Sequence, residues 1–143
     1  MELSARVEYA LAALIELASQ FEEAEPLQIK QIAAQQGIPD RYLEHIFNAL
    51  GRAGIVRGLR GVRGGYLLAR QPQKITLLEV FECFESSQAV KYVQDSLSVN
   101  RSLIRDTWTE AHNKTKDVLH NCTLEDLYQM RSKYEQVDTM YYI

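Results

Sequence analysis

The part of the sequence that decides the fold begins at residues 40–50, which read DRYLEHIFNAL. Apolar side chains recur there at Leu43, Ile46, Phe47 and Leu50, the i, i+3, i+4, i+7 spacing of one helix face. The opposite face carries long polar side chains: Arg41, Glu44, His45, Asn48 and Arg52. The pattern predicts an amphipathic helix whose polar face points outward to meet another molecule.

A β-hairpin is expected directly after this helix. Residues 55–60 (IVRGLR) and 66–69 (YLLA) have strand character, and the glycine-rich residues 61–65 (GVRGG) form the turn between them. Arg60 and Arg63 lie at the tip, and the glycines let the backbone approach phosphates closely. A nucleotide-phosphate loop is the alternative, but no Gly-Lys-Ser/Thr follows and the next residues read as a strand.

Upstream, a short helix is predicted to start near Gln28 or Ile29 and to stop at Gly37, and Asp40 is expected to cap the next helix. Two helices joined by a tight turn and followed by a hairpin form a winged helix-turn-helix. Such a domain reads the major groove with its second helix and the minor groove with its wing.

The remaining segments read mainly as helices. Ser4 caps a first helix, and Thr76 caps another over residues 77–84. Residues 86–100 read as a connector, a long helix follows from about 101 to 121, and a short last helix starts at Thr123. We therefore predict a mainly α chain with a small β-hairpin: a winged domain over 1–85, a connector over 86–100, and a dimerisation helix with a C-terminal tail over 101–143.

The long helix carries a narrow apolar seam with a spacing close to the 3.5 residues of coiled coils. Its members are Ile104, Trp108, Ala111, Thr115, Val118 and Leu119. A seam this narrow favours a partner helix from a second copy of the chain. Packing within one chain remains the alternative.

Charge is concentrated in the middle of the chain. The whole chain has a net charge of −3, but residues 40–75 hold seven basic and two acidic side chains, net +5. The flanking segments, 1–39 and 76–143, are each net −4. A positive segment in an acidic chain is typical of a nucleic-acid contact surface, with an evenly charged solvated surface as the alternative.

Other classes of protein are disfavoured by the sequence. The longest apolar run has seven residues, Tyr9 to Ile15, against roughly 20 for a membrane-spanning helix. We see no secretory signal at the start, and two cysteines are too few for a disulfide scaffold. We expect a cytoplasmic protein with no enzymatic activity and no membrane partner.

Four stretches resemble the bacterial Rrf-two (Rrf2) family of winged-helix regulators over essentially the whole chain. They are YAL at 9–11, YLEHIF at 42–47, RGVRGGYLL at 60–68 and LEDL at 124–127. The resemblance implies a homodimeric repressor or activator that binds an imperfectly palindromic operator, with the long helix crossing between subunits.

The resemblance also implies roles for single residues. It places Arg41, Glu44 and His45 at the major groove and Arg60 in the minor groove. Gln28 would start the helix that crosses the DNA backbone, and Tyr9 would lie near phosphates. Glu44 can select by exclusion, because a carboxylate accepts from cytosine N4 and is repelled by the guanine edge. The predicted DNA-binding set is Tyr9, Gln28, Arg41, Glu44, His45, Asn48, Arg57, Arg60, Arg63 and Gly64.

The chain departs from the cluster-binding members of that family, which carry three cysteines in and around the connector. Residues 84–121 contain no cysteine, so we predict no metal site and no cofactor. A 2Fe-2S cluster held by Glu8, Cys83 and Cys122 is the alternative, because some sensors of that family use a carboxylate at position 8 as a ligand from the other subunit. Such a cluster would make the protein an iron–sulfur or redox sensor.

The C-terminal residues resemble those of the CymR-like branch, whose family role involves pairing with cysteine synthase. Tyr141, Tyr142 and Ile143 are the predicted partner tail, since a free carboxylate beside an apolar Ile143 suits an anion-binding active site. A self-packed tail is the alternative. The sequence thus predicts a sequence-specific DNA-binding regulator, with an interaction module that senses cysteine synthase as the second reading.

Overall fold

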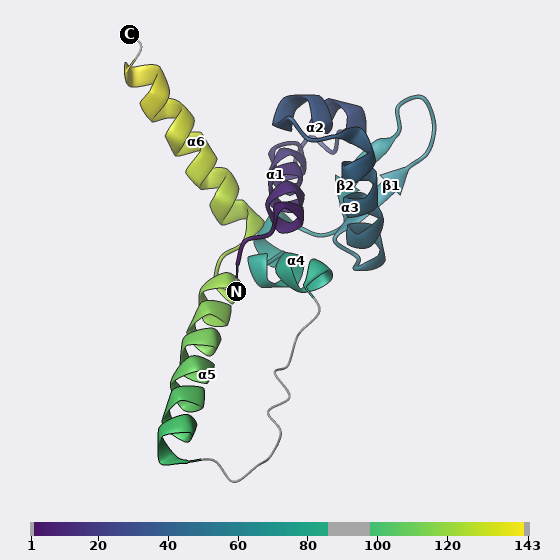
Figure 1. Cartoon of the computed structure of the whole chain (residues 1–143). Helices are drawn as coiled ribbons and strands as arrows, with labels where there is room; N and C mark the ends of the chain where they lie inside the picture. Colours follow the sequence, from purple (N-terminus) through teal and green to yellow (C-terminus); the bar gives the residue numbers. More distant parts are fainter. Residues whose placement is uncertain (1, 86–97, 142–143) are drawn as a thin grey trace.

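The computed structural model describes residues 2–85 and 98–141 and shows helices with one β-hairpin (Figure 1). The elements in chain order are α1 (Ala5–Ser19), α2 (Ile29–Gln36), α3 (Asp40–Arg52), β1 (Val56–Leu59), β2 (Gly65–Leu68), the 3-10 helix η1 (Pro72–Lys74), α4 (Leu77–Phe84), α5 (Val99–His120) and α6 (Leu124–Tyr141). The mainly α class with a small hairpin is confirmed. Helices α1 to α4 gather with the hairpin, and α5 and α6 extend from that body in different directions.

The core lies where α1, α2 and α3 meet the hairpin and α4. All four apolar residues predicted for the inner face of α3, Leu43, Ile46, Phe47 and Leu50, are at most 2% exposed. Phe47 packs against Tyr66 of β2 with ring centroids 4.7 Å apart. The amphipathic pattern of residues 40–50 therefore sets the orientation of α3, with its polar face directed outward.

Local capping starts and ends the helices of the winged domain. The Ser4 hydroxyl accepts a hydrogen bond from the Val7 amide (3.2 Å), and Gly37 ends α2 in the left-handed conformation at φ +67°. The prediction that Asp40 caps α3 is wrong. Pro39 is the N-cap residue, and its carbonyl accepts from the Leu43 amide. Asp40 is already inside the first turn, where its carboxylate interacts favourably with the positive end of the helix dipole.

The wing is a two-stranded antiparallel sheet in which Val56 pairs with Leu68 and Leu59 with Gly65. A bridge from the segment before α2 extends it: the Tyr66 amide donates to the Leu27 carbonyl (2.8 Å), and the Leu27 amide donates back (3.0 Å). The base of the wing is therefore fixed to the residue that precedes Gln28, the N-cap of α2.

The last helix differs from the sequence prediction. Residues 124–141 form a helix of 18 residues rather than a short one, because no glycine or proline interrupts them. Leu124, at its first turn, is fully buried in the core of the winged domain. Backbone hydrogen bonds from Leu77 to Cys122 and from Leu124 to Ile75 fix the α5–α6 junction to the start of α4.

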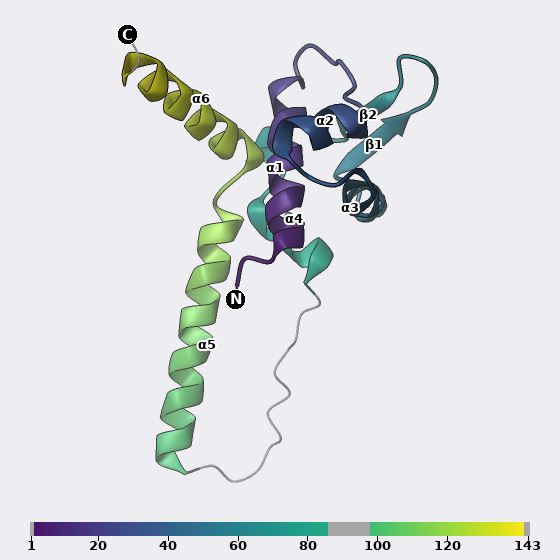
Figure 2. The same cartoon turned by 45° about the horizontal axis from the view of Figure 1, so that its top comes forward.

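Helix α5 begins at Val99, two residues earlier than predicted, with the Ser98 hydroxyl accepting from the Arg101 amide at 3.3 Å. Most of the predicted connector, residues 86–97, lies outside the described residues. Figure 2 shows α5 as a long arm leading away from the winged body. None of the helices in the described ranges is long and apolar enough to cross a membrane.

Candidate nucleic-acid interface

The polar face of α3 is the centre of the candidate interface. Arg41, Glu44, His45 and Asn48 are all exposed on it, as the sequence predicted. Tyr42 is 37% exposed and packs edge-on against Tyr9 of α1, with ring centroids 5.5 Å apart. Tyr9, predicted to lie near phosphates, is half-buried. Its ring therefore also joins α1 to α3.

A hollow between α3, the start of α2 and the wing brings together residues from three separate stretches of sequence. Its lining includes Gln28, Lys30, Glu44, Arg60 and Gly64. Four of these five belong to the predicted DNA-binding set. The structure therefore places the wing beside the polar face of α3, as a groove-reading domain requires.

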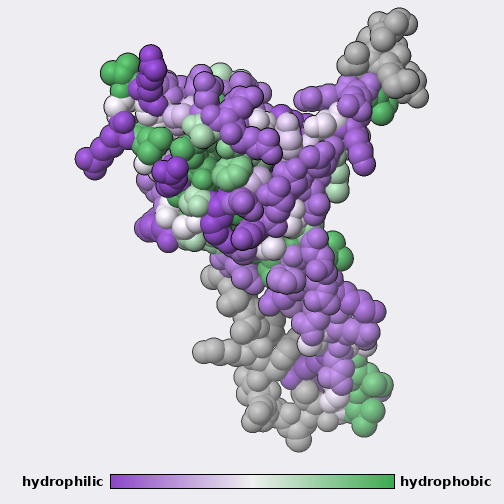
Figure 3. Space-filling model, turned by 180° about the vertical axis from the view of Figure 1, so that it is seen from behind, coloured by the Kyte–Doolittle hydropathy of each residue, from purple (hydrophilic) through white to green (hydrophobic). Residues whose placement is uncertain are grey.

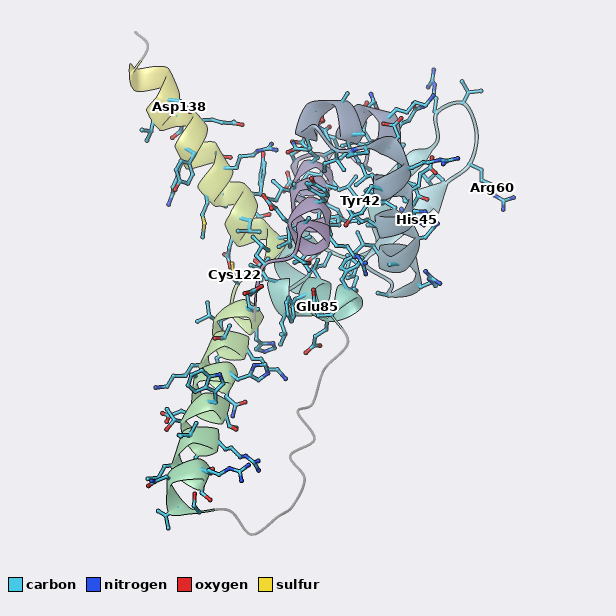
Figure 4. All side chains as sticks on the ribbon, in the orientation of Figure 1. Tyr42, His45, Arg60, Glu85, Cys122 and Asp138 are labelled. Carbon is cyan, nitrogen blue, oxygen red and sulfur yellow. The ribbon has the colours of Figure 1, made fainter. Side chains whose placement is uncertain are left out.

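The tip of the wing is strongly exposed and positively charged. Arg60 and Arg63 flank Val62, which is 96% exposed, and Arg57 is exposed on β1. Figure 4 shows Arg60 projecting from the wing away from the helices, with Tyr42 and His45 on α3. The Gly64 amide donates to the Gly61 carbonyl (2.9 Å), so this N–H closes the loop instead of facing outward.

The arginines of α3 and the wing differ from the paired arginines Arg70 and Arg131. Arg70 pairs with Glu79 (2.6 Å), and Arg131 pairs with Glu16 (2.8 Å). Within the described ranges, Arg41, Arg57, Arg60 and Arg63 have no ion-pair partner. Four of the seven basic residues of segment 40–75 are thus left without a counter-ion around α3 and the wing in the described part of the chain.

Sequence reasoning overlooked Lys30 in the wing-side hollow and Arg6 of α1. Arg6 lines a second hollow with Arg52, His45 and Cys83. Arg6 and Lys30 are the only two basic residues of segment 1–39, whose net charge is negative, so the charge pattern of the sequence does not single them out. Their distance from residues 40–75 along the chain hides their proximity in the fold.

The two cysteines lie in different parts of the chain. Cys83 lies in α4 and Cys122 at the α5–α6 junction, and neither forms a disulfide. Burial raises the pKa of both thiols; nearby carboxylates raise each further, and Arg70 partly opposes this at Cys83. No group of three or more His, Cys, Asp or Glu side chains suited to a metal ion occurs in the described part of this one chain, so Glu8, Cys83 and Cys122 do not form such a group within a single subunit.

The predicted seam of α5 is largely exposed. Ile104, Trp108 and Val118 are 59–70% exposed, and α5 contributes no buried residue. Hydrophobic surface shows near the N-terminal end of this helix (Figure 3), where Val99 and Leu103 are also exposed. Ala111 and Thr115 are exposed, and Leu119 is half-buried. Of the predicted tail, Tyr142 and Ile143 lie outside the described residues, and of Tyr141 only the backbone is described.

Comparison with known proteins identifies relatives along almost the whole chain. The family model Rrf2, described as an iron-dependent transcriptional regulator, matches residues 3–130. The chain is 33% identical over 144 residues to the regulator CymR of Bacillus subtilis, covering all of both chains. It is 31% identical over 130 residues to IscR of Pectobacterium atrosepticum, covering 89% of this chain and 79% of that one.

Solved structures agree with the fold. The structure described as CymR, the global cysteine regulator of B. subtilis, superposes with a TM-score of 0.80 at 31% identity, covering 91% of this chain and 98% of that one. IscR of T. potens gives a TM-score of 0.76 at 31% identity, covering 92% and 88%.

Proposed function

Because the chain belongs to the Rrf2 family of transcriptional regulators, which are not enzymes, we propose that two copies of it bind one palindromic operator. Helix α3 of each subunit enters the major groove, and the wing enters the adjacent minor groove. An operator-binding regulator acts on the chromosome, so the proposal places the protein in the cytoplasm.

The observation that carries the proposal is the set of unpaired arginines around the exposed face of α3. Arginine suits this role because its planar guanidinium can make two parallel hydrogen bonds to a phosphate or to guanine. Arg41 lies on α3 itself, and Arg60 extends from a two-stranded wing thin enough for the minor groove. Glu44, between them in the wing-side hollow, disfavours guanine at the position it faces.

Two subunits are part of the proposal because α5 exposes an apolar seam. Its 22 residues extend about 33 Å at 1.5 Å per residue, close to the roughly 34 Å of one DNA turn. Paired α5 helices would bury Ile104 and Trp108 and would hold two copies of α3 apart by a length on this scale.

The test begins with selection of bound duplexes from random DNA, followed by binding measurements with Arg60→Ala. We expect a palindromic consensus, and we expect the variant to lose about 1–3 kcal/mol of operator-binding free energy. Lys133→Ala, which removes an exposed cation from α6, is the matched control and should bind like the parent. Operator affinity unchanged in Arg60→Ala would remove the wing from the mechanism, and failure to enrich any sequence would refute specific binding.

A role in cysteine metabolism is the more specific candidate, and the end-to-end match to CymR of B. subtilis favours it. Under this proposal the tail Tyr141, Tyr142 and Ile143 binds cysteine synthase. Titration of cysteine synthase with the full chain and with a chain ending at Met140 tests it. Equal affinity of the two chains would contradict the tail's role while leaving operator binding untouched.

A further inference from the structure

Helix α3 is bordered by a second hollow, which lies on a different side of the helix from the wing. It is formed by Arg6 of α1, by Tyr42, His45 and Arg52 of α3, and by Cys83 and Phe84 of α4, with Ile46 and Ala49 between them. The wing-side hollow reaches α3 at Glu44. At about 100° per residue, Glu44 and the His45–Arg52 row lie roughly 80–100° apart around α3, so the exposed strip between the hollows carries Arg41 and Asn48.

The chemistry of the second hollow suits an anion. Two arginines from different helices and a histidine line it, and no acidic side chain does. Arg6 and Arg52 are both exposed, and neither has an ion-pair partner within residues 2–85 and 98–141. A guanidinium offers several donors in a fixed plane, which matches the oxygens of a phosphodiester.

The position of the hollow relates this chemistry to DNA. A helix in the major groove, which is about 12 Å wide, has a sugar-phosphate backbone on each side. In the proposed complex the wing-side hollow, which Gln28, Lys30 and Arg60 line, would face one of these backbones. We propose that Arg6 and Arg52 bind a phosphate of the other backbone, so that α3 is held between two phosphate contacts. This inference rests on the proposed function and adds the residues that fix α3 in the groove.

The consequence is a contribution to affinity without sequence preference, because phosphate contacts position a protein while base contacts specify the sequence. The test uses the full chain, its selected operator and a scrambled duplex of equal length. Arg6→Gln and Arg52→Gln are compared with Lys133→Gln, which removes the same charge from an exposed site on α6. The dissociation constants are measured between about 50 and 200 mM salt.

We expect each arginine variant to bind both duplexes about five- to tenfold more weakly, with an unchanged ratio between operator and scrambled duplex. The slope of log K against log salt should fall by about 1 for each phosphate contact that is lost. Lys133→Gln should match the parent, and thermal unfolding of all variants should be unchanged because the side chains are exposed.

Several results would overturn the inference. Parental affinity and salt slope in both arginine variants would mean that the hollow does not touch DNA, including the case in which it holds a free anion. A loss confined to the operator would assign the arginines to bases instead of phosphates. If the parent binds neither duplex, it is the proposed function that fails, and the two failures are thereby distinguished.

Discussion

Single residues of the wing hold positions that only glycine fits. Gly65 has φ +151°, and a β-carbon placed on it would lie 2.6 Å from the Leu27 carbonyl oxygen. That oxygen accepts the hydrogen bond from Tyr66 which fixes the wing to the start of α2. The glycine therefore maintains the distance between the wing and Gln28, and with it the wing-side hollow.

We expect Gly65→Ala to lower the free energy of unfolding by about 1–3 kcal/mol, through strain at positive φ and displacement of Leu27. The measurement is urea unfolding followed by circular dichroism. Gly51→Ala is the control: this glycine lies within α3 with open space around it, so alanine should stabilise by about 0.5–1 kcal/mol. Equal stability of Gly65→Ala and the parent would show that the contact with Leu27 is not restrictive.

At the scale of elements, the sequence predicted the parts whose pattern is local. The apolar spacing of Leu43 to Leu50 predicted α3, and the glycines around Arg63 predicted the wing turn. The length of α6 was missed, because its apolar residues follow no clear helical period and its burial at Leu124 depends on contacts with distant segments. Arg6 and Lys30 were missed for the same reason, since only the packing of α1 and α2 brings them beside α3.

One polar contact links three elements. Glu16 of α1 accepts hydrogen bonds at the same carboxylate oxygen from Arg131 of α6 (2.8 Å) and from Gln36 of α2 (2.9 Å). Glu16 is 17% exposed in its side chain and Arg131 is 30% exposed, so water screens this pair less than a surface pair. Gln36 ends α2 just before the turn into α3, which ties α6 to the helix-turn-helix.

Arg131→Met should therefore lower the free energy of unfolding by about 1–3 kcal/mol, since the Glu16 carboxylate loses a charged partner. Lys114→Met breaks the exposed α5 pair with Glu110 and should cost less than about 0.5 kcal/mol. Urea unfolding of both variants, and of Glu16→Gln with and without Arg131→Met, measures the coupling. If the effects of Glu16→Gln and Arg131→Met on the free energy of unfolding simply add in the double variant, a direct interaction between Glu16 and Arg131 is contradicted.

At the scale of the whole molecule, the winged body and α5 each expose a surface that has no partner within the described part of one chain. The body leaves arginines without counter-ions, and α5 leaves an apolar seam without a covering surface in one chain. An exposed contiguous apolar surface is typical of a protein–protein contact. In the proposed complex DNA would supply the counter-ions and a second subunit would cover the seam, so one assembly would meet both needs.

Trp108→Asp tests this directly, because a carboxylate in the centre of the seam would be buried without a partner on association. We expect the parent to have twice the 16.4 kDa mass of the chain in light scattering and the variant to have 16.4 kDa. Operator affinity should fall by about 100-fold or more, because each half-site is then bound independently. Asn113→Asp adds the same charge to α5 outside the seam and should remain dimeric, while a dimeric Trp108→Asp would show that the subunits associate through another surface.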